Sequence, residues 1–190
     1  MGMDETKLDK RQIVMEARKL LLEDGIGKLS MRKLASRLDI RAPTLYWYFP
    51  DRAAILREMI LEMLREAVER VPSCDSWEEW LYEFGLSIWH TNSNTPFAPL
   101  LLQSNELNDV SVIDAATATL RERSLQFNVD ETVFLRAHSD INALTAGYSV
   151  FHHAQMSKSL SAFLDMDQAV DEGIRMIVDY WSLKAKMISQ

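Results

Sequence analysis

Residues 30–52 read SMRKLASRLDIRAPTLYWYFPDR, and their spacing predicts two short helices joined by a tight turn. Met31, Leu34 and Leu38 recur at the spacing of one helical face, while charged and polar side chains occupy the other faces. Ser30 stands where an N-cap belongs, because its hydroxyl can accept a hydrogen bond from a backbone N–H of the first turn. The first helix should therefore begin directly after Ser30.

The turn and the second helix follow from the next residues. Asp39 tolerates the left-handed backbone that a turn of three or four residues requires. Pro43 suits the first position of a helix, where the missing N–H costs nothing. We expect this second helix to run from Pro43 to about Phe49 and to end before Pro50.

The charge of this region is opposite to that of the chain. Between Lys28 and Arg57 there are seven basic and two acidic residues, a local net charge of +5 in a chain of net charge −7. A local positive surface of this kind is what phosphate binding needs. Paired helices also occur as ordinary packing in all-α proteins, so the pattern alone leaves DNA binding open.

From Leu8 onward the sequence resembles the DNA-binding head of the TetR family of bacterial repressors. The matching elements are a corner at Gly25, SMRKLA at 30–35, PTLYWY at 43–48 and the pair DR at 51–52. The pattern extends over about 50 residues, which makes it far more specific than a lone short motif. Two positions depart from the family, because the turn has Asp39 in place of the usual Gly, and Ala42 replaces larger polar residues that read a base in relatives.

The resemblance and the geometry together predict the residues that contact DNA. Arg32 is the candidate for reading a guanine edge, and Ala42, Pro43 and Trp47 could meet thymine methyl groups. Arg41 could serve either purpose. The predicted phosphate contacts are Ser30, Lys33, Thr44, Tyr46 and Arg52. Tyr48 completes the predicted set, although the rings of Trp47 and Tyr48 have the alternative of forming part of the small hydrophobic core of the head.

Length and charge predict two domains in an all-α fold. With 190 residues and 47% hydrophobic content, the chain can bury a substantial core. We expect a helix-turn-helix domain over 7–52, with its recognition motif at 30–49, and a connecting helix over 51–70. Residues 72–190 carry a net charge of −9 and should form a helical body, to which the resemblance assigns effector binding and dimerisation.

The body should be a bundle of helices, since no segment has the pattern of a strand. Ser76 and Glu79 have the form of a capping box that opens a helix to about Thr91. The run 92–96 reads as a loop. Further helices are expected at about 96–103, 110–127, 130–155 and 165–186.

Two faces of the body predict a dimer. In the family the last two long helices pair with their symmetry mates, and this sequence offers small or apolar residues for such a contact. The candidate interface residues are Ala143, Ala146, Gly147, Val150, Ile174, Ile177 and Trp181. The alternative is that part of each stripe belongs to the core of a single chain.

Aromatic residues are dense in the segments that surround the effector pocket of relatives. Their chemistry suits a largely apolar or aromatic small molecule, although aromatic residues at helical spacing can equally be plain core. The candidate pocket residues are Trp80, Phe84, Trp89, Gln103, Phe127, Phe134, His138, Asn142, Tyr148 and Phe151.

Metal-dependent recognition of a tetracycline is not expected. The positions that correspond to the ligands of the magnesium–drug complex in tetracycline-binding members are Val68, Ala143 and Phe151 in this chain. None of these side chains can bind magnesium or a polar drug. We expect no cofactor and no metal.

An enzyme and a membrane protein are both disfavoured. The four histidines form no metal-binding or catalytic pattern, and phosphate loops and nucleophile elbows are absent. No apolar stretch approaches the roughly 18 residues of a membrane span, and a single cysteine fits a reducing compartment. We therefore expect a cytoplasmic protein.

The sequence thus predicts a homodimeric, ligand-responsive transcriptional regulator. It should be a repressor that binds a palindromic DNA operator and is released by an apolar or aromatic small molecule. One alternative is a regulator that responds to a protein partner and has no small-molecule effector. The other is an all-α enzyme or binding module whose helix-turn-helix pattern is incidental.

Overall fold

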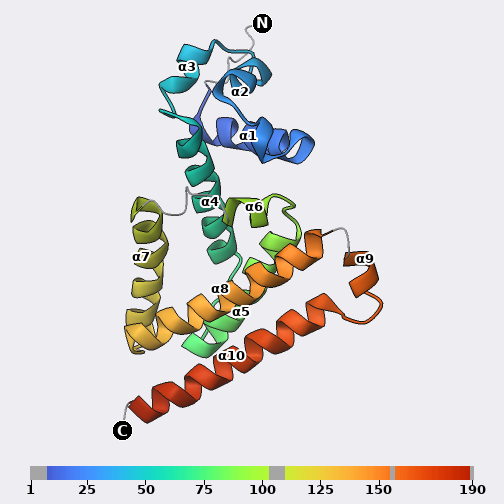
Figure 1. The fold of residues 1–190 in the computed structure, drawn as a ribbon. Helices are drawn as coiled ribbons and strands as arrows, with labels where there is room; N and C mark the ends of the chain where they lie inside the picture. Colours follow the sequence, from blue (N-terminus) through green and yellow to red (C-terminus); the bar gives the residue numbers. More distant parts are fainter. Residues whose placement is uncertain (1–7, 103–109, 155–156, 189–190) are drawn as a thin grey trace, which may run out of the picture. The chain divides into compact units, whose positions relative to one another are not determined.

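The computed structural model describes residues 8–102, 110–154 and 157–188, and these residues form an all-helical fold (Figure 1). Within that described part no strand occurs, which confirms the predicted fold class. The elements in chain order are α1 (Lys10–Asp24), the short 3₁₀ helix η1 (Ile26–Lys28), α2 (Met31–Arg37), α3 (Ala42–Tyr46), α4 (Arg52–Glu69), α5 (Trp77–Ser93), α6 (Ala98–Leu102), α7 (Val110–Gln126), α8 (Glu131–His153), α9 (Ser157–Leu160) and α10 (Met166–Ile188).

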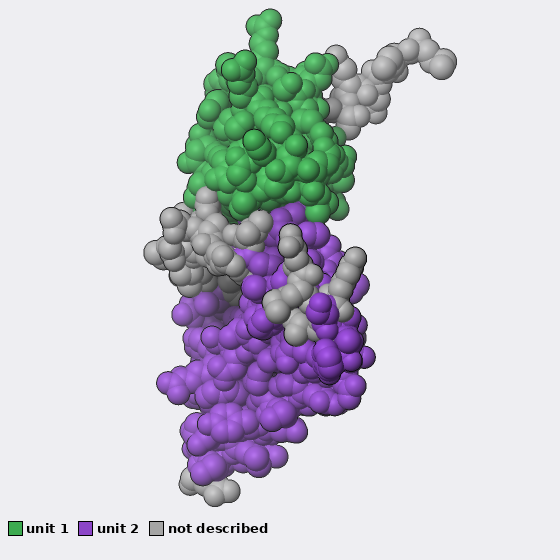
Figure 2. Space-filling model, turned by 45° about the vertical axis from the view of Figure 1, so that its right-hand side comes forward, with its two compact units in different colours: residues 1–60 green, residues 61–190 purple. Residues whose placement is uncertain are grey.

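The chain forms two compact units, which Figure 2 colours separately. We call residues 1–60 the head and residues 61–190 the body. The division falls inside α4, earlier than the break at Pro72 that the sequence suggests. The reason is packing, because Leu64, Ala67 and Val68 of α4 belong to the hydrophobic core of the body.

The head is organised around α1. Asp9 and Gln12 form a reciprocal capping box, in which each side chain accepts a hydrogen bond from the other residue's backbone N–H, at 2.7 and 3.0 Å. The buried residues of α1 lie on one face: Ile13, Val14, Ala17, Leu20 and Leu21. The helix ends at Gly25, whose φ of 81° is a conformation that residues with a side chain rarely adopt.

The helix pair forms with the expected caps. Ser30 Oγ accepts a hydrogen bond from Lys33 N at 3.2 Å, and Asp39 has a left-handed φ of 52°. Both predictions are therefore confirmed. The second helix is shorter than expected and ends at Tyr46, because the N–H groups of Trp47 and Tyr48 bond to carbonyls only three residues back.

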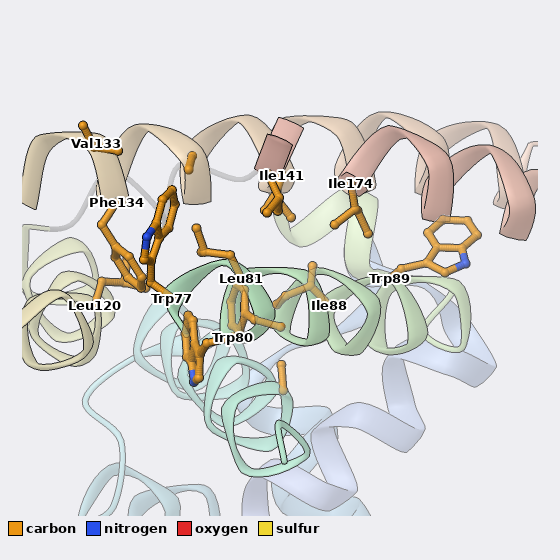
Figure 3. Close-up of a cluster of buried hydrophobic side chains, with 14 of the residues drawn as sticks. Trp77, Trp80, Leu81, Ile88, Trp89, Leu120, Val133, Phe134, Ile141 and Ile174 are labelled. Atoms are coloured by element: carbon orange, nitrogen blue, oxygen red, sulfur yellow. The ribbon is translucent and has the colours of Figure 1, made fainter. Parts of the chain in front are cut away.

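The body is built on three mutually packed helices, α5, α8 and α10. Their inner faces supply most of a hydrophobic core that includes Trp80, Phe84 and Phe134 (Figure 3). Trp80 and Phe84 stack with ring centroids 5.0 Å apart, and Phe134 lies 5.7 Å from Trp80. Many of the aromatic side chains of the sequence thus lie in the hydrophobic core of the body.

Gly85 permits the close approach of these three helices. A Cβ placed on Gly85 would lie 2.9 Å from Ile141 of α8 and 3.0 Å from Ile174 of α10. Both isoleucines are fully buried, and Figure 3 shows them pointing toward α5. Gly173 has a similar role in α10, where a Cβ would meet the end of the Leu144 side chain at 2.8 Å.

Polar contacts tie α10 to its two neighbours. The Tyr82 hydroxyl donates a hydrogen bond to Asp171 at 2.5 Å, and the Arg175 guanidinium lies 4.3 Å from the centre of the Tyr82 ring. Hydrogen bonds from Arg175 and Tyr82 lower the pKa of Asp171. On the other side, the Trp181 indole N–H donates to Asp140 of α8 at 2.8 Å.

The remaining differences from the expected helices are small. Ser76 Oγ caps α5 by accepting from Glu79 N at 3.1 Å, but the Glu79 carboxylate accepts from Asp75 N instead of completing a box with Ser76. The short helix α9 was not expected. Across the described residues, no helix combines the length and apolar character needed to cross a membrane.

We predict that Gly85→Ala destabilises the body by about 1–3 kcal/mol, because the added methyl group must displace two stiff, β-branched side chains. Gly173→Ala is the matched variant, since Leu144 is a flexible side chain that can move aside. Both substitutions share the same gain in helix propensity, so chemical denaturation of the two variants isolates the packing effect. Equal denaturation midpoints for the two variants would show that the packing of α8 and α10 against α5 at Gly85 tolerates a methyl group.

Candidate nucleic-acid interface and ligand cavity

The second helix of the pair presents its side chains to solvent. Pro43, Thr44, Tyr46 and Trp47 are exposed, and Trp47 is 89% exposed. A large aromatic side chain in water is unusual for a residue that merely packs. The structure therefore removes the alternative that Trp47 is core, and it leaves this surface available to a ligand.

The basic residues at either side of the helix pair are also accessible. Arg32 in the first turn of α2 and Arg41 directly before α3 are both exposed. Ala42 is half-buried and presents little side chain, while Ser30 uses its hydroxyl as a helix cap. Of the predicted contacts, Arg32 and Arg41 carry the exposed charge that could reach DNA.

Three predicted DNA contacts are engaged inside the head instead. The Tyr48 hydroxyl donates to the carbonyl of Leu8 at 2.8 Å, and Arg52 donates to the carbonyl of Ile26 at 2.9 Å. Lys33 forms an ion pair of 2.9 Å with Asp24. These contacts hold the start of α1, the turn η1 and the end of α1 in place, so the three side chains have structural roles in the head.

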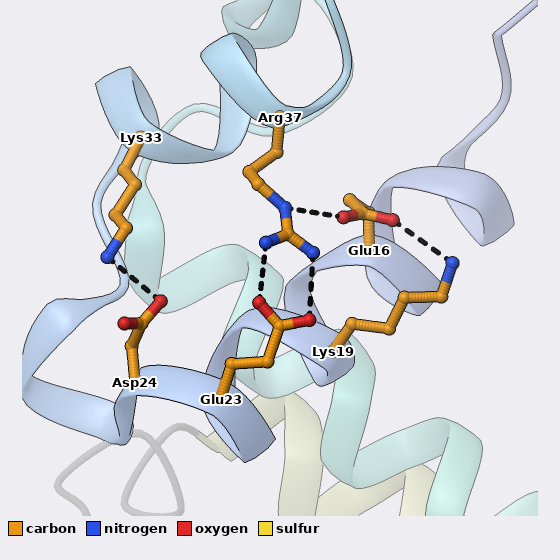
Figure 4. Close-up of polar contacts among 6 residues, drawn as sticks. All are labelled: Glu16, Lys19, Glu23, Asp24, Lys33 and Arg37. Carbon is orange, nitrogen blue, oxygen red and sulfur yellow. Dashed lines mark hydrogen bonds and ion pairs between the residues drawn. The ribbon is translucent and has the colours of Figure 1, made fainter.

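A cluster of charges links α1 to α2 (Figure 4). The Arg37 guanidinium binds Glu23 with two nitrogens, one of them at 3.1 Å, and donates to Glu16 through Nε at 2.8 Å. The carboxylates raise the pKa of Arg37, and the hydrogen bond from Arg37 lowers the pKa of Glu23. Burial raises the pKa of Glu16, but hydrogen bonds from Arg37 and Lys19 outweigh it and the net shift is downward.

Sequence reasoning missed this cluster, although a signal was present. Glu16 and Glu23 are seven residues apart on α1 and therefore share a helical face. Their pairing with Arg37 means that part of the positive charge counted between Lys28 and Arg57 is neutralised within the head. The surface that remains for phosphate is smaller than the sequence count suggests.

The body contains a cavity of about 380 Å³, within the size range of small-molecule sites. The residues that line it come from α4, α5, α7 and α8, and most are apolar. They are Leu61, Leu64, Arg65, Val68, Glu69, Phe84, Thr119, Leu120 and His138.

Two of the predicted pocket residues, Phe84 and His138, line this cavity. Other predicted pocket residues do not line it, and the two rings that lie in the core instead remove more apolar surface from water there. Trp80 and Phe134 are core, the Trp89 indole donates to Asp167 at 2.7 Å, and Phe151 is 51% exposed. Phe127 and Tyr148 pack against the core from its edge, Asn142 contacts His138, and Gln103 lies outside the described residues.

His138 is the polar side chain in contact with the aromatic core at this cavity. Its ring centroid lies 5.1 Å from that of Phe84. Burial lowers the pKa of His138 to about 4, so the ring is neutral at physiological pH. Asn142 Nδ2 lies 2.9 Å from Nε2 and 3.1 Å from Nδ1 of the ring.

The positions compared earlier with a metal–drug site do not converge here. Val68 lines the cavity, whereas Ala143 and Phe151 are exposed elsewhere on the body. Among the described residues, no group of three or more histidine, cysteine, aspartate or glutamate side chains is placed to hold a metal ion.

An apolar stripe on α10 faces solvent. Met176, Tyr180, Leu183 and Met187 are 72%, 52%, 62% and 69% exposed, and their spacing places them along one face of the helix. On the neighbouring α8, the predicted interface residues Ala143, Gly147 and Val150 are also exposed.

The remaining predicted interface residues are less accessible. Ile174 is fully buried in the core of its own chain, so its assignment to a dimer contact is wrong. The physical reason is that Ile174 fills the space that Gly85 leaves open. Ala146, Ile177 and Trp181 are half-buried, and the last two pack against the same core.

The head is similar in sequence to known regulatory proteins. A sequence profile described as bacterial regulatory proteins, tetR family, matches residues 13–59. The tetracycline repressor protein class G of Vibrio anguillarum is 40% identical over 84 residues, which are 43% of this chain and 40% of that protein. The matched segment thus spans less than half the length of this relative.

Solved structures resemble this chain over most of its length. A variant of TetR from Acinetobacter baumannii AYE, in complex with minocycline, has a TM-score of 0.74 at 23% identity and covers 94% of this chain and 99% of its own. The TetR family protein ActR of Streptomyces coelicolor, in complex with (S)-DNPA, has a TM-score of 0.67 at 17% identity, with coverages of 95% and 100%. At these identities the likeness establishes the fold.

We predict that His138 makes the free energy of unfolding depend on pH between about 6.5 and 4. The unfolded chain takes up a proton on this residue near pH 6.5, its ordinary pKa, whereas the folded chain does so only near pH 4. The unfolded state therefore binds more protons in this window, and stability falls as the pH falls. The loss should approach roughly 3 kcal/mol below pH 4.

Denaturation curves measured from pH 7 to pH 4 test this prediction. His138→Gln should remove most of the pH dependence of the free energy of unfolding above pH 4.5. In that range most carboxylates are still ionised and contribute little to the dependence. His90→Gln is the matched control, because His90 is exposed. An unchanged pH dependence in His138→Gln would contradict the prediction.

Proposed function

We propose that this chain is a homodimeric, ligand-responsive transcriptional repressor of the TetR family, whose sequence profile matches residues 13–59. The observation that carries the proposal is the exposed surface of the helix pair α2 and α3, which we call the reading surface. Arg32, Thr44 and Trp47 project from it into solvent. Side chains of this kind fit the major groove and the phosphates that border it.

We propose that the exposed side chains of this surface divide into base contacts and phosphate contacts. Arg32 is the candidate for a bidentate contact with guanine, and Trp47 and Pro43 offer apolar contacts to thymine methyl groups. Thr44, Tyr46 and Arg41 are the candidates for phosphate contacts. Ala42 adds no polar group, so reading at its position depends on its neighbours.

Other predicted contacts act indirectly in this proposal. Tyr48 and Arg52 hold the backbone at Leu8 and Ile26, so we propose that they orient the helix pair and do not themselves bind phosphate. The Lys33 ammonium group has three N–H donors and its side chain is 40% exposed, so it could contact a phosphate while it remains paired with Asp24.

We propose that the apolar stripe on α10 and the exposed face of α8 form the dimer contact. Four large apolar side chains on one helix face are costly to leave in water, and a second copy of the chain would cover them. Two heads related by twofold symmetry would read a palindromic operator with half-sites about 34 Å apart, or a multiple of that.

We propose that the cavity in the body binds the effector. Its wall includes Leu61, Leu64 and Val68 of α4, and the same helix contributes Ile55 and Met59 to the core of the head. A ligand that shifts α4 in the body would therefore act on a helix that is shared with the head. Such coupling is reciprocal, so operator DNA must weaken effector binding by the same factor. The presence of the cavity favours a small-molecule effector over a protein partner.

The DNA part of the proposal predicts that Arg32→Ala reduces base discrimination by about 1–3 kcal/mol. The operator would first be selected from a random DNA pool, and binding would then be measured to the operator and to its single-base variants. Arg136→Ala, an exposed arginine of the body, is the matched control for the loss of one positive charge. A failure to enrich any sequence, together with no DNA binding at low salt, would refute a DNA-binding function.

A uniform loss of affinity across all sequences in Arg32→Ala would have a narrower meaning. It would assign Arg32 to phosphate binding and leave base reading to residues of α3.

The dimer part predicts that Leu183→Glu converts the protein to monomers and abolishes operator binding, because a charge in the centre of an apolar contact is strongly unfavourable. Leu125→Glu is the matched variant, since Leu125 is 79% exposed on α7, outside the proposed contact. Sedimentation velocity distinguishes the two species. A dimer that persists in Leu183→Glu would place the contact elsewhere.

A further inference from the structure

The charge cluster between α1 and α2 carries an inference about operator recognition. Arg37, the last residue of α2, donates three hydrogen bonds to carboxylates of α1, two to Glu23 and one to Glu16 (Figure 4). Lys19 also binds Glu16, at 3.2 Å, so two cations balance two carboxylates within the cluster. A bidentate pair inside such a network is the kind of ion pair that holds two helices in one geometry.

The surroundings of Arg37 are unfavourable for a phosphate. A guanidinium has five N–H groups, and three of those of Arg37 are directed to α1. A phosphate that approached the other two would also approach the Glu23 carboxylate, which has the same sign of charge as the phosphate and is 52% exposed. The cluster is therefore better suited to holding α2 on α1 than to binding DNA.

Directed polar contacts tie both ends of α2 to α1. The helix has only seven residues, and its buried apolar side chains fix its angle weakly because the hydrophobic effect is not directional. In the first turn, Lys33 pairs with Asp24 at 2.9 Å. In the last turn, Arg37 binds Glu16 at 2.8 Å and Glu23 with two nitrogens. A rotation or slide of α2 against α1 must therefore break one of these contacts.

The turn after α2 passes this orientation on to α3. Asp39, with its left-handed φ of 52°, donates its backbone N–H to the carbonyl of Ser36 at 3.3 Å. The N–H of Ile40 donates to the carbonyl of Ala35 at 3.0 Å. These two bonds form a Schellman motif, which fixes the direction in which the chain leaves the helix. Since residues 38–41 are all that separates α2 from α3, the angle of α2 sets the angle at which α3 can enter the major groove.

We propose that Arg37 is a positioning residue for operator recognition, which binds no DNA itself and, through Glu16 and Glu23, holds the helix pair in the orientation that reads bases. The inference rests on the proposed DNA-binding function and names a residue on which its selectivity depends. A head that leaves this orientation still meets phosphates, because contacts to the DNA backbone do not depend on sequence. Loss of the cluster should therefore weaken binding to the operator more than binding to random DNA.

The double variant Arg37→Met/Glu23→Gln of the full-length protein removes the bidentate pair and leaves the net charge of the head unchanged. If the competent orientation falls to about one-third of the population in each head, a dimer loses roughly tenfold in operator affinity, because the two fractions multiply. Affinity for a random-sequence duplex should stay within about twofold, and the salt slope of operator binding should not change. Arg41→Met, at a proposed phosphate contact, should instead lower that slope by about 0.9 per head.

Arg37→Lys separates the charge of Arg37 from its geometry. The ammonium group keeps the positive charge, but it lacks the planar fork that binds Glu23 with two nitrogens while Nε binds Glu16. We expect this variant to show most of the loss of operator affinity, whereas a plain charge effect or a phosphate contact would survive the substitution.

The matched control is Arg121→Met/Glu131→Gln, which makes the same two substitutions in the body. Arg121 Nε donates to Glu131 at 2.9 Å, and both side chains are exposed. This variant should bind the operator and random DNA as the unchanged protein does.

Three results would overturn the inference. Arg37→Lys could bind the operator as tightly as the unchanged protein, which would show that charge alone suffices. The double variant could lower the salt slope by about 0.9 per head, which would make Arg37 a phosphate contact. Operator and random DNA could lose affinity in equal proportion, which is the signature of a folding defect.

Failure of the proposed function has a different signature. In that case the unchanged protein itself selects no operator and binds no DNA at low salt, and the inference falls with the function. If the unchanged protein binds its operator and only the comparison among the variants fails, the proposed function stands and the role of Arg37 is refuted.

Discussion

The close approach of three helices at Gly85 is the constraint on which the body depends. Because α5 has no side chain at this point, Ile141 and Ile174 can fill the space against its backbone. The same arrangement sets the site, since Phe84 precedes the glycine and His138 lies one turn before Ile141 on α8. The wall of the cavity is therefore continuous with the close packing at Gly85, and its two rings are held by rigid elements.

The head uses its charges differently. Lys33, Arg37 and Arg52 are engaged with partners inside the head, whereas Arg32 and Arg41 are exposed cations of the helix pair. Internal pairing restricts where positive charge can meet phosphate, and a restricted charge pattern favours one docking orientation over many. The net charge of a segment therefore says less about DNA binding than the subset of its charges that remains accessible.

Local chemistry was predictable from the sequence, and distant contacts were not. The caps at Ser30 and the left-handed turn at Asp39 depend on neighbouring residues, so short patterns reveal them. The bond from Arg52 to Ile26 spans 26 residues and leaves no such trace. For the pocket, helical spacing shows which faces are apolar, but it cannot show where packing leaves space. Trp80 and Ile174 became core for this reason, whereas Phe84 and His138 remained at the cavity.

Because Trp47 is exposed, its fluorescence can report on the surface of the helix pair. Trp77, Trp80 and Trp89 are 8%, 2% and 6% exposed, and Trp181 is half-buried, whereas Trp47 is 89% exposed. A water-soluble collisional quencher would thus reach the indole of Trp47, directly after α3, before it reached the others. The fraction of emission that such a quencher removes becomes a label-free measure of whether the reading surface is covered, in the unmodified chain and at equilibrium.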